Sequence, residues 1–173
     1  VGVAGLEGGP FDAVLVNDAR VLGEELRGSD PNEAGAREFA RLLAERGVTV
    51  EGGAVAGAAP ASTIELAAIE SAPLSAVVGE MLGNSDNNTA ELLVKELAVA
   101  EGGAGTTAAG LDVVRDQLIG WGVDVGPVVL ADGSGLSLDN RATCAAVLEV
   151  LQRAGHDSPV GAGLPVAAQT GTL

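Results

Sequence analysis

Apolar residues recur at helical spacing in several separate segments of this 173-residue chain, and they read as strands only over short stretches. The predicted helices cover residues 31–46, 74–81, 88–98, 106–121 and 141–153, and the predicted strands cover 11–16, 48–50, 63–69 and 128–130. Helices outnumber strands, and the two do not alternate strictly. We therefore predict an α+β fold rather than a doubly wound parallel sheet.

Local start and stop signals support these boundaries. Asp30 is suited to cap the first helix, Pro31 to occupy its first position, and Glu33 to supply the reciprocal carboxylate of a capping box. Further along that helix, one face is predicted to carry Phe39, Leu42 and Leu43. The pair Asn17 and Asp18 predicts a turn after the first strand.

Composition limits both the core and the possible partners. Aromatic residues make up 2% of the chain, so the core must consist of Val, Leu, Ile and Ala. A single cysteine cannot close an intrachain disulfide, and the apolar run around Cys144 predicts a buried thiol. The net charge of −15 argues against nucleic-acid binding, because Lys and Arg supply most nonspecific affinity for phosphates.

Membrane and export signals are absent from the sequence as written. No apolar stretch reaches the roughly 18 residues that a membrane-spanning helix needs, which predicts no transmembrane segment in this chain. The first residues, VGVAGLEGG, lack the charged region of a signal peptide. We expect the chain to begin part-way through a longer protein.

Two short polar motifs are candidates for chemistry. Ser85-Asp86-Asn87 interrupts an apolar pattern and can present a hydroxyl and a carboxamide to one cleft, although the same residues also serve as helix N-caps. Thr170-Gly171-Thr172 combines a glycine that lets a ligand approach the backbone with hydroxyls that bind a carboxylate. Their order matches the S-D-N and K-T-G motifs of serine enzymes that recognise penicillin.

Longer segments carry the same resemblance. They are VNDARV, SDPNEAGAREFARLLAERGVTV, ESAPLSAVVGEMLGNSDNNTAELLVKELA, LADGSGLSLDNRAT, and LPVA followed by QTGTL. In this order they resemble class C penicillin-binding proteins, the S13-type D-alanyl-D-alanine carboxypeptidases. The resemblance implies a β-lactamase/transpeptidase-like fold, an antiparallel sheet flanked by helices, with residues 1–173 forming the C-terminal part of the domain.

The resemblance also implies a function. In that family a serine within S-x-x-K attacks a peptidoglycan stem peptide ending in D-Ala-D-Ala, outside the cytoplasmic membrane, and β-lactams trap the same serine. The match assigns proton transfer and substrate-amide binding to Ser85 and Asn87. It assigns binding of the substrate carboxylate to Gln169, Thr170 and Gly171. No metal or other cofactor is implied.

Three features depart from the family pattern. Lys95 is the only lysine, and Leu92 precedes it by three positions, so S-x-x-K is absent. Gln169 replaces the lysine of K-T-G and brings no positive charge. Residues 167 and 168 adjoin where the family usually has a further polar stretch, so we expect a missing segment there.

The departures leave three interpretations open. The chain is part of an active enzyme whose nucleophile lies on other residues, or a degenerate relative that binds peptidoglycan or a partner without chemistry, or an unrelated α+β domain with chance motifs. No other nucleophile and base are evident in the sequence. His156, the only histidine, is expected to face solvent in a loop.

Overall fold

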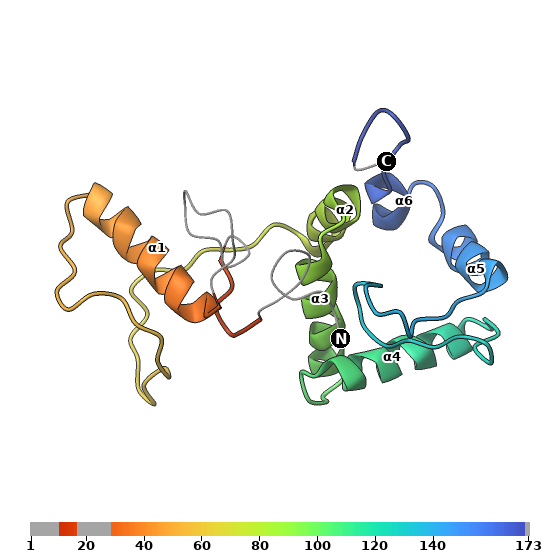
Figure 1. Ribbon diagram of the computed structural model, residues 1–173, viewed down its shortest axis with the longest axis horizontal. Coiled ribbons are helices and arrows are strands. Elements are labelled where there is room, and N and C mark those ends of the chain that lie inside the picture. Colours follow the sequence, from red (N-terminus) through yellow and green to blue (C-terminus); the bar gives the residue numbers. More distant parts are fainter. Residues whose placement is uncertain (1–10, 17–28, 172–173) are drawn as a thin grey trace. The chain divides into compact units, whose positions relative to one another are not determined.

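The computed structural model describes residues 11–16 and 29–171 (Figure 1). Contacts divide the chain into an N-terminal unit, residues 2–69, and a C-terminal unit that begins at Glu70. The turn predicted at Asn17 and Asp18 lies outside the described residues.

The N-terminal unit contains helix α1, Pro31–Glu45. As predicted, the Asp30 carboxylate accepts the backbone N–H of Glu33 at 2.9 Å, and Pro31 occupies the first turn. The Glu33 carboxylate does not complete the capping box but pairs with Arg37 one turn further on. The predicted cap from the Asp30 side chain is therefore confirmed, whereas the predicted return hydrogen bond from the Glu33 carboxylate is wrong.

Ion pairs link the later turns of α1. The Arg41 guanidinium donates to the Glu38 carboxylate at 2.9 and 2.5 Å and also pairs with Glu45. This hydrogen bond to Arg41 holds the pKa of Glu38 below its ordinary value. The exposed side of α1 is thus fixed by charge rather than by apolar packing.

The buried side of α1 differs from the predicted face. Phe39 is 64% exposed, whereas Ala34 and Gly35 are buried. A β-carbon added at Gly35 would lie 3.0 Å from Cγ1 of Val14, and the Val14 N–H donates to Oδ1 of Asn32 at 2.9 Å. The helix therefore meets segment 11–16 through small residues, and the large aromatic side chain stays mostly exposed.

The C-terminal unit consists mainly of helices. In chain order these are α2 (Leu74–Asn84), α3 (Asn87–Ala100), α4 (Thr107–Gly120), α5 (Cys144–Ala154) and α6 (Pro159–Gly163) (Figure 1). At the starts of α3 to α6, backbone N–H groups of the first turn donate to the side-chain oxygen of the capping residue, which is Asp86, Thr106, Thr143 and Ser158 in turn. Helix α6 was not predicted, although Ser158-Pro159 is a normal helix start.

Helices α3 and α4 are in backbone contact. Val94 and Ala98 of α3 are buried, and so is Gly110 of α4. A β-carbon built at Gly110 would lie 1.9 Å from the carbonyl oxygen of Val94. Only glycine fits at this crossing, so the approach of the two helices depends on it.

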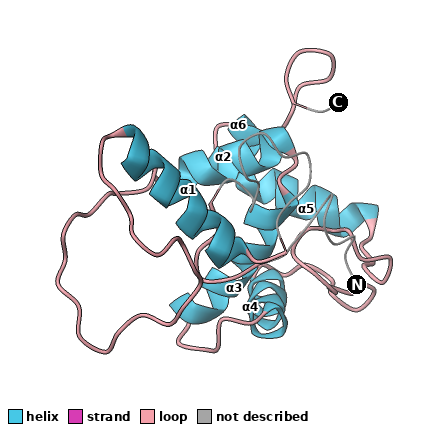
Figure 2. Cartoon of the chain, turned by 60° about the vertical axis from the view of Figure 1, so that its left-hand side comes forward, coloured by secondary structure: helices cyan, strands magenta, loops and turns pink. Residues whose placement is uncertain are grey.

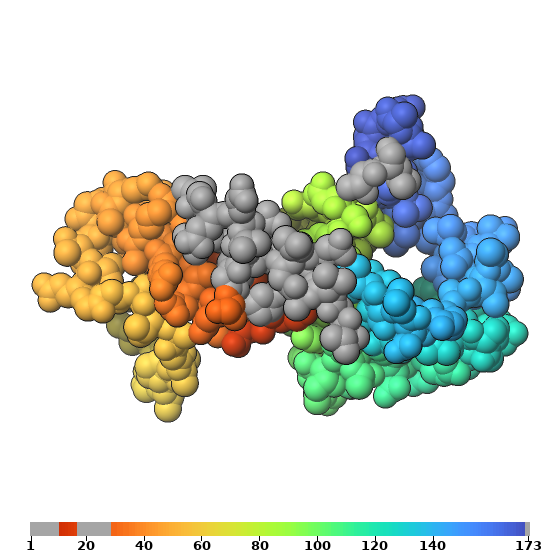
Figure 3. Space-filling view, in the orientation of Figure 1, coloured from red at the N-terminus to blue at the C-terminus, as the bar shows by residue number. Residues whose placement is uncertain are grey.

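A second cluster covers the other end of α4. Its buried members are Val123, Val128 and Ala146, with Leu118, Val125 and Leu130 packed around them. The space-filling view shows the segment near residues 130–140 (light blue) against α4 (teal) (Figure 3). The Arg115 guanidinium also donates to the Val128 carbonyl at 3.2 Å. All buried hydrophobic residues in the described ranges are Ala or Val, which agrees with an aliphatic core.

The prediction for Cys144 was wrong. Cys144 is exposed as the first residue of α5, while Ala146 of the same helix is buried. Apolar residues continue around this helix, with Val147 and Leu148 about half exposed. Periodicity alone could not indicate which of these residues another element covers.

The predicted antiparallel sheet is not found among residues 11–16 and 29–171 (Figure 2). One isolated antiparallel bridge joins Val129 to Arg141, with both N···O distances at 2.9 Å. Segments 48–50 and 63–69 are exposed and belong to no ladder. A strand is stable only when a neighbour takes its backbone hydrogen bonds, and these segments have β-type sequences without such a neighbour.

Replacing Gly110 with Ala should lower the free energy of unfolding by at least about 2 kcal/mol, because the new methyl group overlaps the Val94 carbonyl. Gly120 is the matched control. It lies in the same helix with no atom within 4 Å of an added β-carbon, and its replacement by Ala should be neutral or stabilise by up to about 1 kcal/mol. Urea unfolding of the purified protein measures both, and equal effects would contradict the packing described.

Candidate active site

Ser85 connects two helices in an unusual backbone conformation. Helix α2 ends at Asn84, and Ser85 has φ 55° and ψ 47°, the left-handed region. Residues other than glycine adopt this backbone conformation at a cost of roughly 1–2 kcal/mol. Ser85 is exposed, so its hydroxyl is accessible at the junction. Such strain at an accessible polar residue is typical of functional sites.

Asp86, not Ser85 or Asn87, caps α3. Its Oδ1 accepts the N–H groups of Asn88 at 3.0 Å and Thr89 at 3.2 Å, and its Oδ2 accepts the Thr89 hydroxyl at 2.7 Å. The helix-cap explanation of the motif therefore applies to its central residue. Ser85 and Asn87 flank the cap, and capping does not require a hydroxyl and a carboxamide at these two positions.

Thr170 and Gly171 lie in a turn. The Thr170 N–H donates to the Val166 carbonyl at 2.9 Å, and the Val166 N–H donates to the Thr170 hydroxyl at 3.0 Å. These two bonds close the chain on itself, which removes the backbone groups that a strand would offer. Gln169 is exposed in the same turn, and Thr172 lies outside the described residues.

The turn brings the two motifs to the same end of α2. Gly171 has φ 75°, and a β-carbon added there would lie 2.8 Å from the carbonyl oxygen of Gly83. Gly83 precedes Ser85 by two residues. Sequence motifs about 85 positions apart are thus neighbours in the C-terminal unit.

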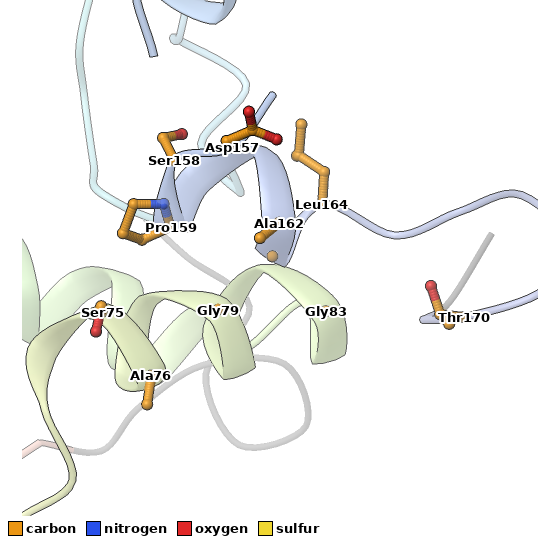
Figure 4. A pocket seen from close by; sticks show the side chains of 11 residues that line it. Ser75, Ala76, Gly79, Gly83, Asp157, Ser158, Pro159, Ala162, Leu164 and Thr170 are labelled. Atoms are coloured by element: carbon orange, nitrogen blue, oxygen red, sulfur yellow. The ribbon is translucent and has the colours of Figure 1, made fainter. Parts of the chain in front are cut away.

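A shallow hollow of about 580 Å³ lies between α2 and α6 (Figure 4). The two helices approach so closely that a β-carbon added at Gly163 would lie only 2.7 Å from Cα of Gly79. Ser75, Ser158 and Thr170 are among the lining residues, and Figure 4 shows Thr170 beyond the Gly83 end of α2. The hollow therefore extends toward the end of α2 at which the motifs meet.

The loop 132–135 packs beside α3 and is closed by Asp132. Its carboxylate accepts N–H groups from Gly135 at 2.7 Å and Ser137 at 2.6 Å, and the Asn140 amide at 2.8 Å. The Glu91 carboxylate of α3 holds the same loop from the other side. Sequence reasoning missed Glu91, because its contacts are with a loop more than 40 residues away in sequence.

His156 faces solvent as predicted, with its side chain 98% exposed and Nδ1 3.0 Å from Asp157. Within the part of the chain that the structure describes, no cluster of three or more His, Cys, Asp or Glu residues is arranged to hold a metal ion. Over the same residues, no helix is both long and apolar enough to cross a bilayer.

Known proteins resemble this chain in sequence and in structure. The sequence profile of the D-Ala-D-Ala carboxypeptidase 3 (S13) family matches residues 12–173. A D-alanyl-D-alanine carboxypeptidase from an Actinomadura species is 37% identical over 93% of this chain and 30% of its own length. Carboxypeptidase DacB of Mycolicibacterium smegmatis is 30% identical over 98% of this chain and 39% of its own length.

A solved structure shares the fold. Penicillin-binding protein 4 of Haemophilus influenzae, crystallised with a β-lactam, matches with a TM-score of 0.68 and 25% identity, over 85% of this chain and 35% of that one. The chain belongs to the D-Ala-D-Ala carboxypeptidase 3 (S13) family. It spans about a third of the length of the relatives it matches.

Replacing Ser85 with Gly should raise the free energy of unfolding by up to about 1 kcal/mol, because glycine adopts the left-handed region without the penalty of a β-carbon. Ser85→Ala is the control. It removes the same hydroxyl but keeps the β-carbon, so its stability should stay within about 0.5 kcal/mol of the parent. Thermal and urea unfolding measure both variants, and a stabilised Ser85→Ala would argue against backbone strain.

Proposed function

We propose that this chain is the C-terminal part of a serine-type D-Ala-D-Ala carboxypeptidase that cleaves peptidoglycan stem peptides outside the cytoplasmic membrane, with an endopeptidase reaction on cross-linked peptides as a second activity. Family membership and the juxtaposition of Thr170-Gly171 with the end of α2 support the proposal. In this proposal residues 1–173 belong to a penicillin-binding domain, with a segment missing near 167–168.

Each candidate residue then has a chemical role. The exposed Ser85 hydroxyl relays a proton toward the leaving amine, because a hydroxyl can both donate and accept. The Asn87 carboxamide hydrogen-bonds the substrate amide. The Thr170 hydroxyl and the Gly171 backbone bind the terminal carboxylate, since donors on a fixed turn suit an anionic group.

The nucleophile in this proposal comes from residues outside this chain. Lys95 cannot belong to S-x-x-K because residue 92 is Leu. The S-x-x-K serine attacks the carbonyl of the penultimate D-Ala, the terminal D-Ala leaves, and water releases the acyl group. β-Lactams acylate the same serine and so act as inhibitors.

Full-length protein that contains this chain should form a covalent adduct with a fluorescent penicillin and release D-Ala from a D-Ala-D-Ala peptide. The chain of 173 residues alone should do neither. Gel fluorescence and intact mass measure the adduct. A folded full-length sample without an adduct would overturn the enzyme proposal, and turnover by the chain alone would overturn the view that Ser85 is a helper.

Two variants at position 85 distinguish a proton-relay role of the Ser85 hydroxyl from a purely structural role in the full-length protein. Ser85→Ala and Ser85→Gly should both lower turnover by about 10²-fold or more, because each removes the proton relay, although their effects on stability differ. Turnover of Ser85→Gly at the parent level would show that the hydroxyl has no part in the reaction.

The second candidate is a binding module of the same fold without catalytic activity. Gln169 favours it, because a neutral amide supplies no positive field for the substrate carboxylate. In that case full-length protein would bind a D-Ala-D-Ala peptide without forming an adduct.

Replacing Gln169 with the lysine of the K-T-G motif tests whether a positive charge at this position promotes substrate binding. Gln169→Lys in the full-length protein should raise kcat/KM for a D-Ala-D-Ala peptide by about tenfold, or about 1.4 kcal/mol, since an ammonium group attracts the substrate carboxylate and a neutral amide carries no charge. Gln169→Met, which removes the donor without adding charge, should lower kcat/KM. A lysine variant with unchanged kcat/KM would show that position 169 does not contact the carboxylate.

A further inference from the structure

Glu91 is a buried carboxylate with no role in the mechanism above. It is 9% exposed in the middle of α3. Its Oε1 accepts the N–H of Gly133 at 2.9 Å, the N–H of Ser134 at 2.9 Å and the Ser134 hydroxyl at 2.8 Å. One oxygen therefore binds three donors from a loop more than 40 residues away in sequence.

Burial of a carboxylate is unfavourable unless donors compensate for lost water. The three bonds to Oε1 provide that compensation, and they converge on two adjacent residues, Gly133 and Ser134. An apolar side chain at position 91 would leave two backbone N–H groups without this acceptor. The interaction therefore fixes the loop as well as satisfying the carboxylate.

The loop contacts α3 at Glu91 and Val94, and helical spacing places Asn87 on the same face as Glu91. Residues four apart share a helix face, and Glu91 follows Asn87 by four. A β-carbon at Gly133 would lie 2.9 Å from the Ala90 carbonyl oxygen and 2.7 Å from Cγ2 of Val94, so the loop backbone rests directly on the helix. Its other end is closed by the Asp132 carboxylate.

We propose that Glu91 is a positioning residue for the Ser-Asp-Asn side of the site. By holding Gly133 and Ser134 against α3, it fixes the surface beside Asn87 and keeps that carboxamide in place for the substrate amide. This inference rests on the proposed function. It makes loop 132–135 a structural support of the site, although the loop belongs to neither motif.

The test uses full-length protein and the second-order rate of acylation by a fluorescent penicillin, measured well below the melting temperature of each variant. Glu91→Ala should lower the rate by about tenfold or more, because small misplacements of binding groups reduce rates strongly. Glu91→Gln keeps an oxygen acceptor and should stay within about threefold of the parent. Ser134→Ala removes one of the three bonds and should fall between them.

Glu96→Ala is the matched control, since Glu96 is an exposed glutamate of the same helix. It should acylate at the parent rate. If Glu91→Ala loses thermal stability while its folded fraction acylates at the parent rate, Glu91 is purely structural and the inference is wrong. If Glu91→Ala fails to fold, Ser134→Ala decides, and an unchanged rate for that variant would also overturn the inference.

The reaction of the parent protein with penicillin distinguishes failure of the proposed function from failure of the positioning role of Glu91. A parent that forms no adduct overturns the proposed function, and the positioning role falls with it. A parent that reacts, with a Glu91→Ala variant that reacts equally fast, overturns the positioning role alone.

Discussion

Close packing around α3 is the constraint on which the C-terminal unit depends. Its first turn is closed by the Asp86 carboxylate, its middle receives loop 132–135 through Glu91, and its Val94 carbonyl meets α4 at Gly110. None of these contacts relies on a large apolar side chain. The unit is instead organised by backbone approach and by carboxylates that accept several N–H groups each, which fits a chain with 2% aromatic residues.

Helices could be predicted from the sequence because their signals are local. Asp30, Thr106 and Thr143 accept N–H groups within three residues, so the information for a helix start is contained in a few adjacent positions. A sheet depends on partners that sequence does not identify, and the segments 48–50 and 63–69 have none among the described residues. The exposure of Cys144 has a similar cause, because helical periodicity does not specify which face is covered.

For the candidate site, residue types were predictable and contacts were not. The motifs indicated Ser85, Asn87 and Thr170, but not the left-handed backbone at Ser85 or the turn that brings Gly171 to Gly83. Glu91 was missed because nothing in its neighbourhood marks it as different from Glu96 on the same helix. Its role depends on residues more than 40 positions away, and only the folded chain brings them together.

Val94 contacts two glycines at once. Its carbonyl and Cγ1 face Gly110, and its Cγ2 faces Gly133, so one residue sets the spacing on both sides of α3. The three positions are therefore coupled by packing. Ala at position 94 would remove the Cγ2 contact at 133, but the Ala90 carbonyl oxygen would still lie 2.9 Å from a β-carbon there. At 110 the nearest contact is the peptide carbonyl of residue 94 itself, which every residue type carries. Glycine should therefore persist at both 110 and 133 whatever residue stands at 94.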